Sequence, residues 1–164
     1  MSFWKKEIYN RVKNFKKLVI LCVGNPEASD DGVGVEIGKR LLENLFDSPD
    51  VFIFNCYTAA ENFTSPVKKI MPSHILIIDS CVAGKVPGTV SVFCPDDLKE
   101  EDISSHRIPV QLLSRYLKNE TGADVIIIGI EPEILGKGRH LSGSVKNAAD
   151  EIVEFLLKIF RKNW

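Results

Sequence analysis

The sequence predicts an α/β protein: a three-layer α/β/α sandwich around a mostly parallel, mixed and twisted sheet. Short, uninterrupted apolar runs are typical of strands buried on both faces of such a sheet. The segments between them carry apolar residues at helical spacing. Strands that alternate with helices in this way form a mostly parallel sheet covered on both sides. The expected strands are Leu18–Val23, Val51–Cys56, His74–Ile78, Thr89–Phe93 and Val125–Ile130.

Residues 1–17 differ from the rest of the chain in charge. They carry six basic residues against one acidic residue, Glu7. Trp4, Ile8, Val12 and Phe15 recur at helical spacing, so we expect a basic amphipathic helix. The apolar stripe of this helix could dock on its own domain, as in most globular proteins. Alternatively, the helix could form a docking surface for a partner or a membrane.

Turn and helix patterns separate the first four strands. The loop Gly24–Asp30 is followed by a helical face, and Thr58–Glu61 matches a capping box that opens a helix to about Ile70. The loop Val82–Gly88 is too short for a crossover helix, so the strand Thr89–Phe93 is expected to be antiparallel. The residues of the first helical face are Val33, Ile37, Leu41, Leu42 and Leu45.

Two further helices complete the pattern. After an acidic loop at Asp96–Asp102, Pro109 suits the first turn of a helix that ends near Gly122. Ser142 can cap a last helix that runs through Phe160. The apolar face of that helix consists of Val145, Ala149, Ile152, Leu156 and Ile159.

Composition limits the class of protein. The length of 164 residues suits a single domain, and we expect one domain over residues 1–164. With 21 basic and 22 acidic residues, the net charge of -1 gives no reason to expect a nucleic-acid partner. No apolar run reaches the roughly 18 residues that a membrane span needs, and the N-terminus lacks the apolar segment of a signal peptide.

The four cysteines indicate a reducing compartment. Cys22, Cys56, Cys81 and Cys94 lie in or just after apolar runs and form no C-x-x-C pair. A reduced thiol in such a run behaves as a small apolar side chain, so we expect neither disulfides nor a zinc knuckle. We therefore expect a cytoplasmic protein.

The first candidate site is the loop after the first strand. Sites in open parallel sheets lie beyond the carboxyl ends of the strands. Asp30 and Asp31 stand between that strand and its helix, but the loop is not G-x-G-x-x-G, and the two carboxylates would repel a phosphate. A cation is the better ligand. We expect Ser29 or Asp30 to cap the helix, whereas Asp31 either complements the helix dipole or binds the cation.

Two other loops supply candidates. Asp79 directly follows the apolar run of a buried strand, where a carboxylate must be solvated, paired or bound to a metal. His106 precedes a helix and could be solvated or a ligand. His74 begins a strand at the opposite end of the sheet, so we interpret it as structural, and His140 lies in the glycine-rich loop 136–143.

Asp31, Asp79 and His106 together could grip a metal ion at three points. Two carboxylates and one imidazole leave coordination positions open and suit borderline divalent ions, although they hold a free ion weakly. The sequence contains no H-E-x-x-H, G-x-S-x-G or P-loop motif. Cys81 is a weak candidate nucleophile, because no histidine is demonstrably adjacent to it.

Short motifs in a fixed order resemble one family. Leu21–Asn25 followed by Asp30–Gly34 resembles the opening of the nickel–iron hydrogenase maturation endopeptidases. The resemblance covers about residues 18 to 160, and Pro95–Leu98 with its spacing to His106 looks most like the hydrogenase-3-type branch. The other matching segments are Thr58–Asn62, Ile77–Ser80, Pro87–Thr89, His106 with Pro109 and Leu112, Gly129–Pro132, and Leu141–Ser142 with Val145.

The resemblance implies an aspartic-type endopeptidase. Members of the family remove a C-terminal extension from the precursor of the hydrogenase large subunit after nickel has been inserted. The metal-contacting residues of the family align with Asp31, Asp79 and His106. The nickel is carried by the substrate, so no tightly bound cofactor is expected. Residues 1–17 and the loop Pro26–Ser29 depart from the family pattern and could alter partner choice.

The resemblance also implies a mechanism and partners. The three aligned residues would complete the coordination of the precursor's nickel, and water would attack the scissile carbonyl. Either the metal or a carboxylate acting as base could activate this step. The expected partner is the precursor, with no nucleic acid, and any membrane contact would be made through residues 1–17.

Two alternatives stay open, because fold similarity alone does not settle function. The chain could be a non-catalytic, metal-sensing maturation accessory that binds the loaded precursor without cutting it. It could also be a nucleotide-binding α/β module, although Asp30 and Asp31 oppose that function.

Overall fold

One mixed sheet of five strands lies at the centre of the molecule. The structure, a computed structural model, describes residues 1–45, 48–97 and 109–162. In space the strand order is β2-β1-β3-β5-β4, with β4 antiparallel to β5 and the other neighbours parallel. This confirms the predicted mixed sheet and its antiparallel strand. The strands are β1 (Leu18–Val23), β2 (Val51–Tyr57), β3 (His74–Ser80), β4 (Val90–Phe93) and β5 (Asp124–Ile130).

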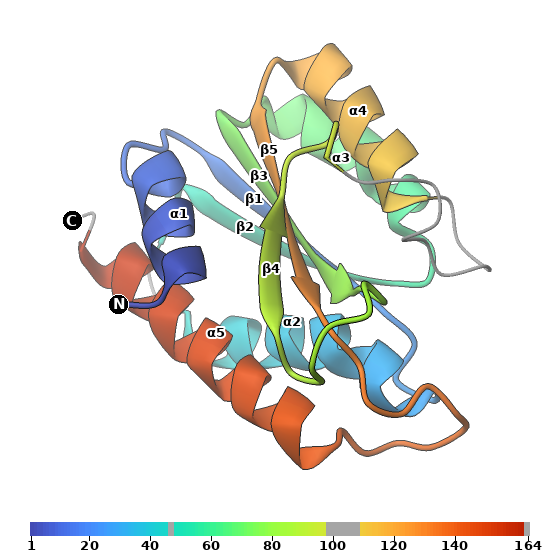
Figure 1. Cartoon of the computed structure of the whole chain (residues 1–164). Helices are drawn as coiled ribbons and strands as arrows, with labels where there is room; N and C mark the ends of the chain where they lie inside the picture. Colours follow the sequence, from blue (N-terminus) through green and yellow to red (C-terminus); the bar gives the residue numbers. More distant parts are fainter. Residues whose placement is uncertain (46–47, 98–108, 163–164) are drawn as a thin grey trace.

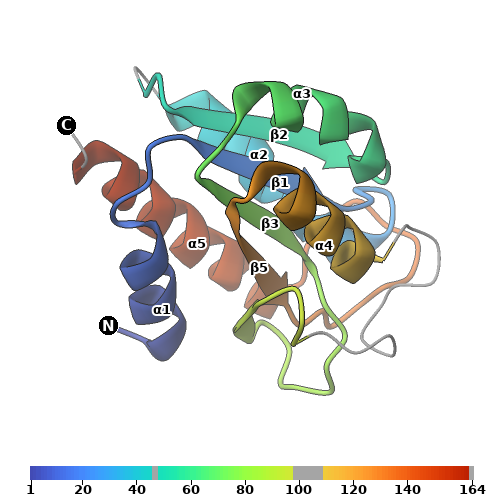
Figure 2. The ribbon, with the colours of Figure 1, turned by 90° about the horizontal axis from the view of Figure 1, so that it is seen from above.

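Helices cover both faces of this sheet. Figures 1 and 2 show α2 and α5 on one face and α3 and α4 on the other, with α1 beside α5. The three-layer arrangement matches the prediction. The helices are α1 (Phe3–Val12), α2 (Val33–Asn44), α3 (Thr64–Ile70), α4 (Val110–Thr121) and α5 (Gly143–Lys162), with short 3-10 turns η1 (Ser29–Gly32) and η2 (Ala60–Phe63).

The central strands supply side chains to both layers of the core. Every residue of β1 is buried. Ile20 and Cys22 belong to the cluster under α2 and α5, whereas Val19 and Leu21 belong to the cluster under α3 and α4. Because successive side chains of a strand point to opposite faces, a strand covered on both sides must be apolar throughout. All four cysteines are free thiols. Burial raises the pKa of the Cys56 thiol to about 12.

The N-terminal helix docks on its own domain. Ile8 and Val12 are fully buried, and the Trp4 ring meets the Phe155 ring edge-on at a centroid distance of 5.3 Å. The helix ends at Val12 rather than near residue 17, since the following residues turn toward β1 and the Lys16 N–H donates to Ser73 Oγ. The apolar stripe is therefore covered by the protein itself.

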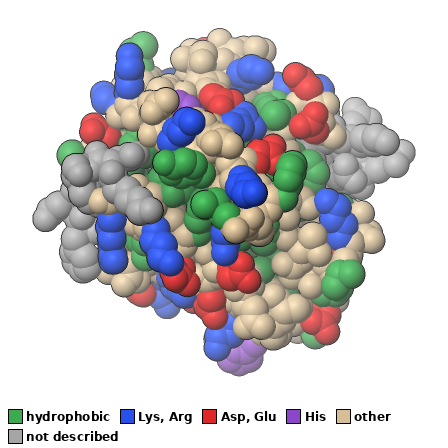
Figure 3. Space-filling model, turned by 60° about the vertical axis from the view of Figure 1, so that its left-hand side comes forward, with side chains coloured by type: hydrophobic (Ala, Val, Ile, Leu, Met, Phe, Trp, Pro, Cys, Tyr) green, Lys and Arg blue, Asp and Glu red, His purple; other side chains and the backbone are tan. Residues whose placement is uncertain are grey.

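The lysines of this segment face outward. The side chains of Lys6, Lys13, Lys16 and Lys17 are exposed. Figure 3 shows the left-hand side of Figure 1, where blue Lys and Arg side chains lie around green hydrophobic ones. In the part of the chain that the structure describes, no helix is both long and apolar enough to cross a bilayer.

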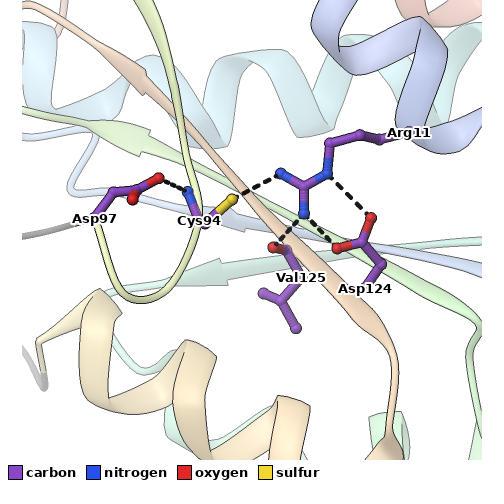
Figure 4. A network of polar contacts seen from close by, with 5 residues as sticks. All are labelled: Arg11, Cys94, Asp97, Asp124 and Val125. Atoms are coloured by element: carbon purple, nitrogen blue, oxygen red, sulfur yellow. Dashed lines mark hydrogen bonds and ion pairs between the residues drawn. The ribbon is translucent and has the colours of Figure 1, made fainter.

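A polar network fastens α1 to the amino edge of the sheet (Figure 4). We call it the Arg11 clasp, formed by Arg11, Cys94 and Asp124. The Arg11 Nε donates to Asp124 Oδ2 at 3.0 Å, and Nη2 donates to Asp124 Oδ1. Arg11 also donates to Cys94 Sγ at 3.3 Å and to the Val125 carbonyl at 3.1 Å. One guanidinium thus joins α1 to the start of β5 and to the residue after β4.

Two local helix predictions were wrong. Leu42 is 51% exposed, so it does not belong to the buried face of α2. The segment Thr58–Glu61 does not open a helix, because η2 intervenes and α3 begins at Thr64 without a side-chain cap. A helix starting at Thr58 would place Pro66 in its interior, where the proline ring clashes with the preceding turn. Starting at Thr64 puts the proline in the first turn, where it is tolerated.

The positions of the last two helices were confirmed. Pro109 immediately precedes α4, and Gly122 ends that helix in the left-handed conformation. Helix α5 begins one residue after Ser142, whose carbonyl accepts a hydrogen bond from the Lys146 N–H at 2.8 Å. The Ser142 hydroxyl donates to Asp30 Oδ2, so the cap by its side chain stays a prediction. The predicted apolar face of α5, from Val145 to Ile159, is buried. Of the acidic loop, only Asp96 and Asp97 lie within the described residues.

Candidate functional site

Three loops gather at one end of the sheet. They follow β1, β3 and β5 and comprise residues 24–32, 81–89 and 131–142; Figure 1 shows them together at the lower right. The carboxyl ends of parallel strands meet at this edge, which is where sites form in open α/β sheets.

Asp31 lies in the turn η1 between β1 and α2. Its side chain is only 8% exposed. One carboxylate oxygen, Oδ1, accepts a hydrogen bond from the Ser80 hydroxyl at 2.7 Å, and Oδ2 accepts one from the Asn25 N–H at 3.2 Å. Asp31 is therefore held against the end of β3 rather than extended into solvent.

Asp79 is the next-to-last residue of β3 and is 9% exposed. Its Oδ1 accepts a hydrogen bond from the Ser80 N–H at 2.8 Å. Ser80 therefore contacts both carboxylates, one through its hydroxyl and the other through its main chain. The structure therefore places Asp79 near the end of β3 and Asp31 in the turn after the neighbouring strand β1, with Ser80 in contact with both.

The three histidines of the chain lie in three different places. His106 lies outside the described residues, so its place relative to the two carboxylates stays a prediction. His74 begins β3 at the opposite edge of the sheet, as expected, and its Nδ1 lies 2.9 Å from Ser73 Oγ. His140 is exposed and lines a groove of about 470 Å³ between α2 and α5. Within residues 1–45, 48–97 and 109–162, no three His, Cys, Asp or Glu side chains are grouped to hold a metal ion.

Asp30 does not cap a helix, and neither does Ser29. Gly32 precedes α2 without a side-chain cap, and the Ser29 hydroxyl donates to the Gly136 carbonyl at 2.7 Å. Asp30 is fully buried and accepts hydrogen bonds from the N–H groups of Glu133 (2.9 Å) and Ile134 (2.8 Å).

Two more hydrogen bonds complete this arrangement. The Ser142 N–H donates to Asp30 Oδ1 at 2.7 Å, and the Ser142 hydroxyl donates to Oδ2 at 2.8 Å. Burial alone would raise the pKa of Asp30, but hydrogen bonds from Ile134, Ser142 and Glu133 lower it below its ordinary value. We call this set of contacts the Asp30 clamp. It attaches the loop after β5 to the loop that carries Asp31.

Glycines allow these elements to come close together. A Cβ on Gly34 would lie 2.2 Å from the Val23 carbonyl oxygen and 2.6 Å from that of Ile78. The first turn of α2 therefore rests directly on the ends of β1 and β3. A Cβ on Gly24 would similarly lie 2.3 Å from the main-chain oxygen of Asp31. No side chain larger than hydrogen fits at either position without a backbone shift.

Glu131 is a buried carboxylate at the same end of the sheet that the sequence analysis did not single out as a candidate. It directly follows β5 and is only 6% exposed. Its Oε2 accepts a hydrogen bond from the Ala83 N–H at 2.8 Å, and its main chain binds Gly88 and Thr89. A carboxylate directly after a buried strand is the pattern that singled out Asp79, so the same pattern could have identified Glu131.

Comparison with known proteins settles the family. A family model described as HycI, hydrogenase maturation protease, matches residues 35–159. The chain belongs to this family. A Methanocaldococcus jannaschii protein assigned by name to the hydrogenase maturation proteases is 32% identical, over 96% of each chain. The hydrogenase 3 maturation protease of Escherichia coli K12 is 30% identical, over 84% of this chain and 87% of that one.

The fold agrees with this assignment. The crystal structure of the [NiFe] hydrogenase maturation protease HycI from Thermococcus kodakarensis superimposes with a TM-score of 0.87 and 26% identity. The match covers 94% of this chain and 99% of that one. The maturation protease is therefore an enzyme, a hydrolase of the endopeptidase class, as the sequence resemblance predicted.

Proposed function

We propose that this protease removes the C-terminal extension of a nickel–iron hydrogenase large-subunit precursor after nickel has been inserted. The pair Asp31 and Asp79 is the observation that carries the proposal. Both carboxylates are less than a tenth exposed and both contact Ser80, at the end of the sheet where sites form. The 30% identity to a hydrogenase 3 maturation protease supports a substrate of the hydrogenase-3 type.

Asp31, Asp79 and His106 are the proposed contacts to the nickel of the precursor. Two carboxylates and one imidazole fill only part of the coordination sphere of a divalent ion. Such a set suits an ion that arrives with ligands of its own, held by the precursor. The enzyme binds only the nickel-loaded precursor tightly, so cleavage depends on prior nickel insertion. Because the precursor supplies the nickel, the chain needs no tightly bound cofactor.

The proposed reaction is hydrolysis of one peptide bond. Water attacks the scissile carbonyl, the carbon–nitrogen bond breaks, and the leaving amine takes a proton. Either the nickel polarises the carbonyl, or Asp31 or Asp79 takes the proton of the attacking water. The proposed location is the cytoplasm, which the absence of a disulfide among the four cysteines supports.

A cleavage assay tests this function. The large-subunit precursor from the same organism is incubated with the protease in nickel-loaded and nickel-free forms, and intact masses are measured. We expect the loaded form alone to lose a C-terminal peptide. If both forms bind the protein but neither is cut, the non-catalytic accessory function is correct instead. Saturable thermal stabilisation by nucleotides would support the nucleotide-binding alternative, which the two aspartates of the first loop oppose.

Any membrane contact of this protease is proposed to be electrostatic. The apolar stripe of α1 is buried, whereas Lys6, Lys13, Lys16 and Lys17 are exposed. Exposed lysines attract anionic lipid headgroups without inserting into the bilayer. Co-sedimentation with anionic vesicles that disappears at high salt would support such contact, and no sedimentation at low salt would exclude it.

A further inference from the structure

The two outermost strands of the sheet differ in how their outer edges are protected. In the order β2-β1-β3-β5-β4, β2 pairs only with β1, and β4 pairs only with β5. The outer edge of such a strand presents main-chain N–H and C=O groups that can pair with another chain. Natural proteins usually protect such an edge with a short strand, a lysine or a covering element.

Strand β4 has all three kinds of protection. It is only four residues long, Val90–Phe93. The Lys85 Nζ donates to Ser91 Oγ at 2.7 Å and lies 5.8 Å from the centre of the Phe93 ring. Helix α1 packs against β4, and its Arg11 contacts Cys94, the residue after the strand. This edge of the sheet is therefore protected within the molecule.

Strand β2 has neither the short length nor the charge. It runs for seven residues, Val51–Tyr57, without a charged residue or a proline. In the part of the chain that the structure describes, no strand pairs with its outer edge. Phe52, Ile53 and Phe54 are only partly buried. A long, uncharged and apolar edge of this kind favours association with another strand.

Main-chain groups in the middle of β2 point away from the sheet. The Leu18 N–H donates to the Asp50 carbonyl at 2.8 Å, just before β2 begins. Alternate residues of a strand bond to the same neighbour, so the even-numbered residues of β2 bond toward β1. The N–H and C=O groups of Ile53 and Asn55 therefore point outward. Within the described residues, no main-chain group bonds to them there.

Apolar side chains lie on both faces of this edge. A Cβ on Gly38 would lie 2.2 Å from Asn55 Oδ1, so that side of α2 faces β2. Leu42 lies one turn further along the same side of α2 and is 51% exposed. On the other face, the Phe54 and Phe63 rings lie 5.6 Å apart. We call the following residues the β2 edge: Leu42, Phe52, Ile53, Phe54 and Asn55.

A second copy of the same chain fits this edge best. Antiparallel pairing about a two-fold axis places Ile53 of one copy opposite Asn55 of the other, so the outward main-chain groups of both residues are satisfied. The strand carries no charge, so two copies meet there without repulsion. A substrate would leave after each turnover and uncover the edge again, whereas a second copy covers it throughout.

We propose that two copies of this protein associate through the β2 edge, with the two β2 strands antiparallel and the two sheets joined into one. Phe54 then lies beside its own counterpart at the two-fold axis, and Leu42 becomes covered. This inference goes beyond the cleavage of the precursor and does not depend on it.

The mass of the full chain in solution tests the pairing. Size-exclusion chromatography with light scattering, over a concentration series, should give twice the chain mass of 18.4 kDa. Ile53→Pro removes an outward N–H and should give the monomer. Val92→Pro in β4 is the matched control and should stay dimeric. Its N–H also points outward, because the Glu131 N–H donates to the Thr89 carbonyl at 3.0 Å.

A second pair of variants changes only exposed side chains. Leu42→Lys places a charge beside the β2 edge, and Leu112→Lys on α4 is its control, since these leucines are 51% and 57% exposed. We expect Leu42→Lys to raise the dimer Kd about tenfold or more, and Leu112→Lys to keep it within about twofold. Thermal unfolding of all four variants identifies any loss of fold. Equal Kd values for the two lysine variants would overturn the proposal.

Hydrogen exchange of the wild type needs no variant. The Ile53 and Asn55 amides should exchange slowly in the dimer and fast in dilute monomer. A dimer in which both amides exchange fast, or one that persists in Ile53→Pro, has its interface elsewhere and contradicts the proposal. A wild type that is monomeric at every concentration also overturns it. In that case, weaker binding of nickel-loaded precursor by Ile53→Pro would assign the β2 edge to the substrate.

Discussion

The two edges of the sheet are fastened by different means. At the amino edge, the Arg11 clasp joins α1 to the sheet mainly through side chains, with Lys5 and Glu151 paired nearby at 3.0 Å. At the carboxyl edge, the Asp30 clamp uses one buried carboxylate to bind three main-chain N–H groups and one hydroxyl. A main-chain clamp fixes the path of the loops that carry Asp31, whereas a side-chain clasp only attaches a helix.

The Asp30 clamp should therefore matter for catalysis and stability, whereas the Arg11 clasp should matter mainly for the attachment of α1. The carboxyl edge should lose activity or stability steeply when a single atom changes, because its partners are backbone groups that cannot rearrange. The amino edge should tolerate similar changes better, because its partly exposed side chains can find water or other partners. Four substitutions test this contrast, from the largest expected effect to the smallest.

Asp79→Asn should nearly abolish cleavage. The change removes one carboxylate of the proposed nickel contact with almost no change of shape. We expect kcat/KM for nickel-loaded precursor to fall roughly 100-fold or more, with an unchanged thermal unfolding profile. Cleavage is followed by intact mass, and Asp97→Asn, in the turn after β4, serves as the control. A fall of less than about tenfold would remove Asp79 from its proposed role.

Gly34→Ala should destabilise the fold strongly. The added Cβ would lie 2.2 Å from the Val23 carbonyl oxygen, so α2 must move away from the sheet. We expect a loss of about 3 kcal/mol in the free energy of unfolding, measured by urea denaturation. Gly136→Ala, in the loop after β5, is the matched control because nothing lies within 4 Å of its added Cβ. Similar losses for both variants would contradict the proposed close packing.

Asp30→Asn should weaken the clamp in a pH-dependent way. The amide places an NH2 group opposite N–H donors, which should lower the free energy of unfolding at pH 7 by about 2–3 kcal/mol. The pKa of Asp30 is lowered in the folded protein, so its stabilising contribution is fully present above the ordinary aspartate pKa of about 3.9. That contribution is lost as the pH falls through the lower, folded pKa.

The pH series provides the check. Denaturation of wild type and Asp30→Asn between pH 7 and pH 3 should show a stability difference that narrows below about pH 4. A difference that stays constant over this range would show that Asp30 contributes through packing rather than through its charge.

Arg11→Met should have the smallest effect. The Arg11 and Asp124 side chains are 21% and 42% exposed, so their pairing is partly screened by water. We expect a loss of about 1 kcal/mol in the free energy of unfolding and no change in cleavage. Arg115→Met removes a more exposed pair with Asp96 and should cost less still. A fall in kcat for Arg11→Met would show that the amino edge influences the site.

The sequence predicted the sheet well because each strand is a separate apolar run. Strand Leu18–Val23 was predicted to the residue, and the others to within one or two residues. Local helix signals were less reliable. Thr58–Glu61 has the residues of a capping box, but Pro66 determines where the helix starts. Leu42 fits helical spacing, yet its side of α2 is left uncovered.

The candidate site was only partly predictable, because some of its contacts join residues that are far apart in the sequence. Asp31 and Asp79 could be found because Asp79 follows an apolar run and Asp31 lies in the loop after another, and topology brings the carboxyl ends of such strands to one side of the sheet. The partners of Asp30 lie 103 to 112 residues further along the chain, so nothing in its neighbourhood distinguishes a clamp from a helix cap. His106 lies outside the described residues, and its part in the site stays a prediction.

The long sequence separation between Asp30 and its partners has a consequence for biosynthesis. A ribosome releases the loop of Asp31 early, but Ser142 emerges more than a hundred residues later. Contacts this distant in sequence form late in folding, because the intervening chain must first be closed into a loop. The clamp therefore forms only when the loop after β5 and Ser142 are available, so a nascent or truncated chain that lacks them leaves the buried carboxylate of Asp30 without these hydrogen bonds.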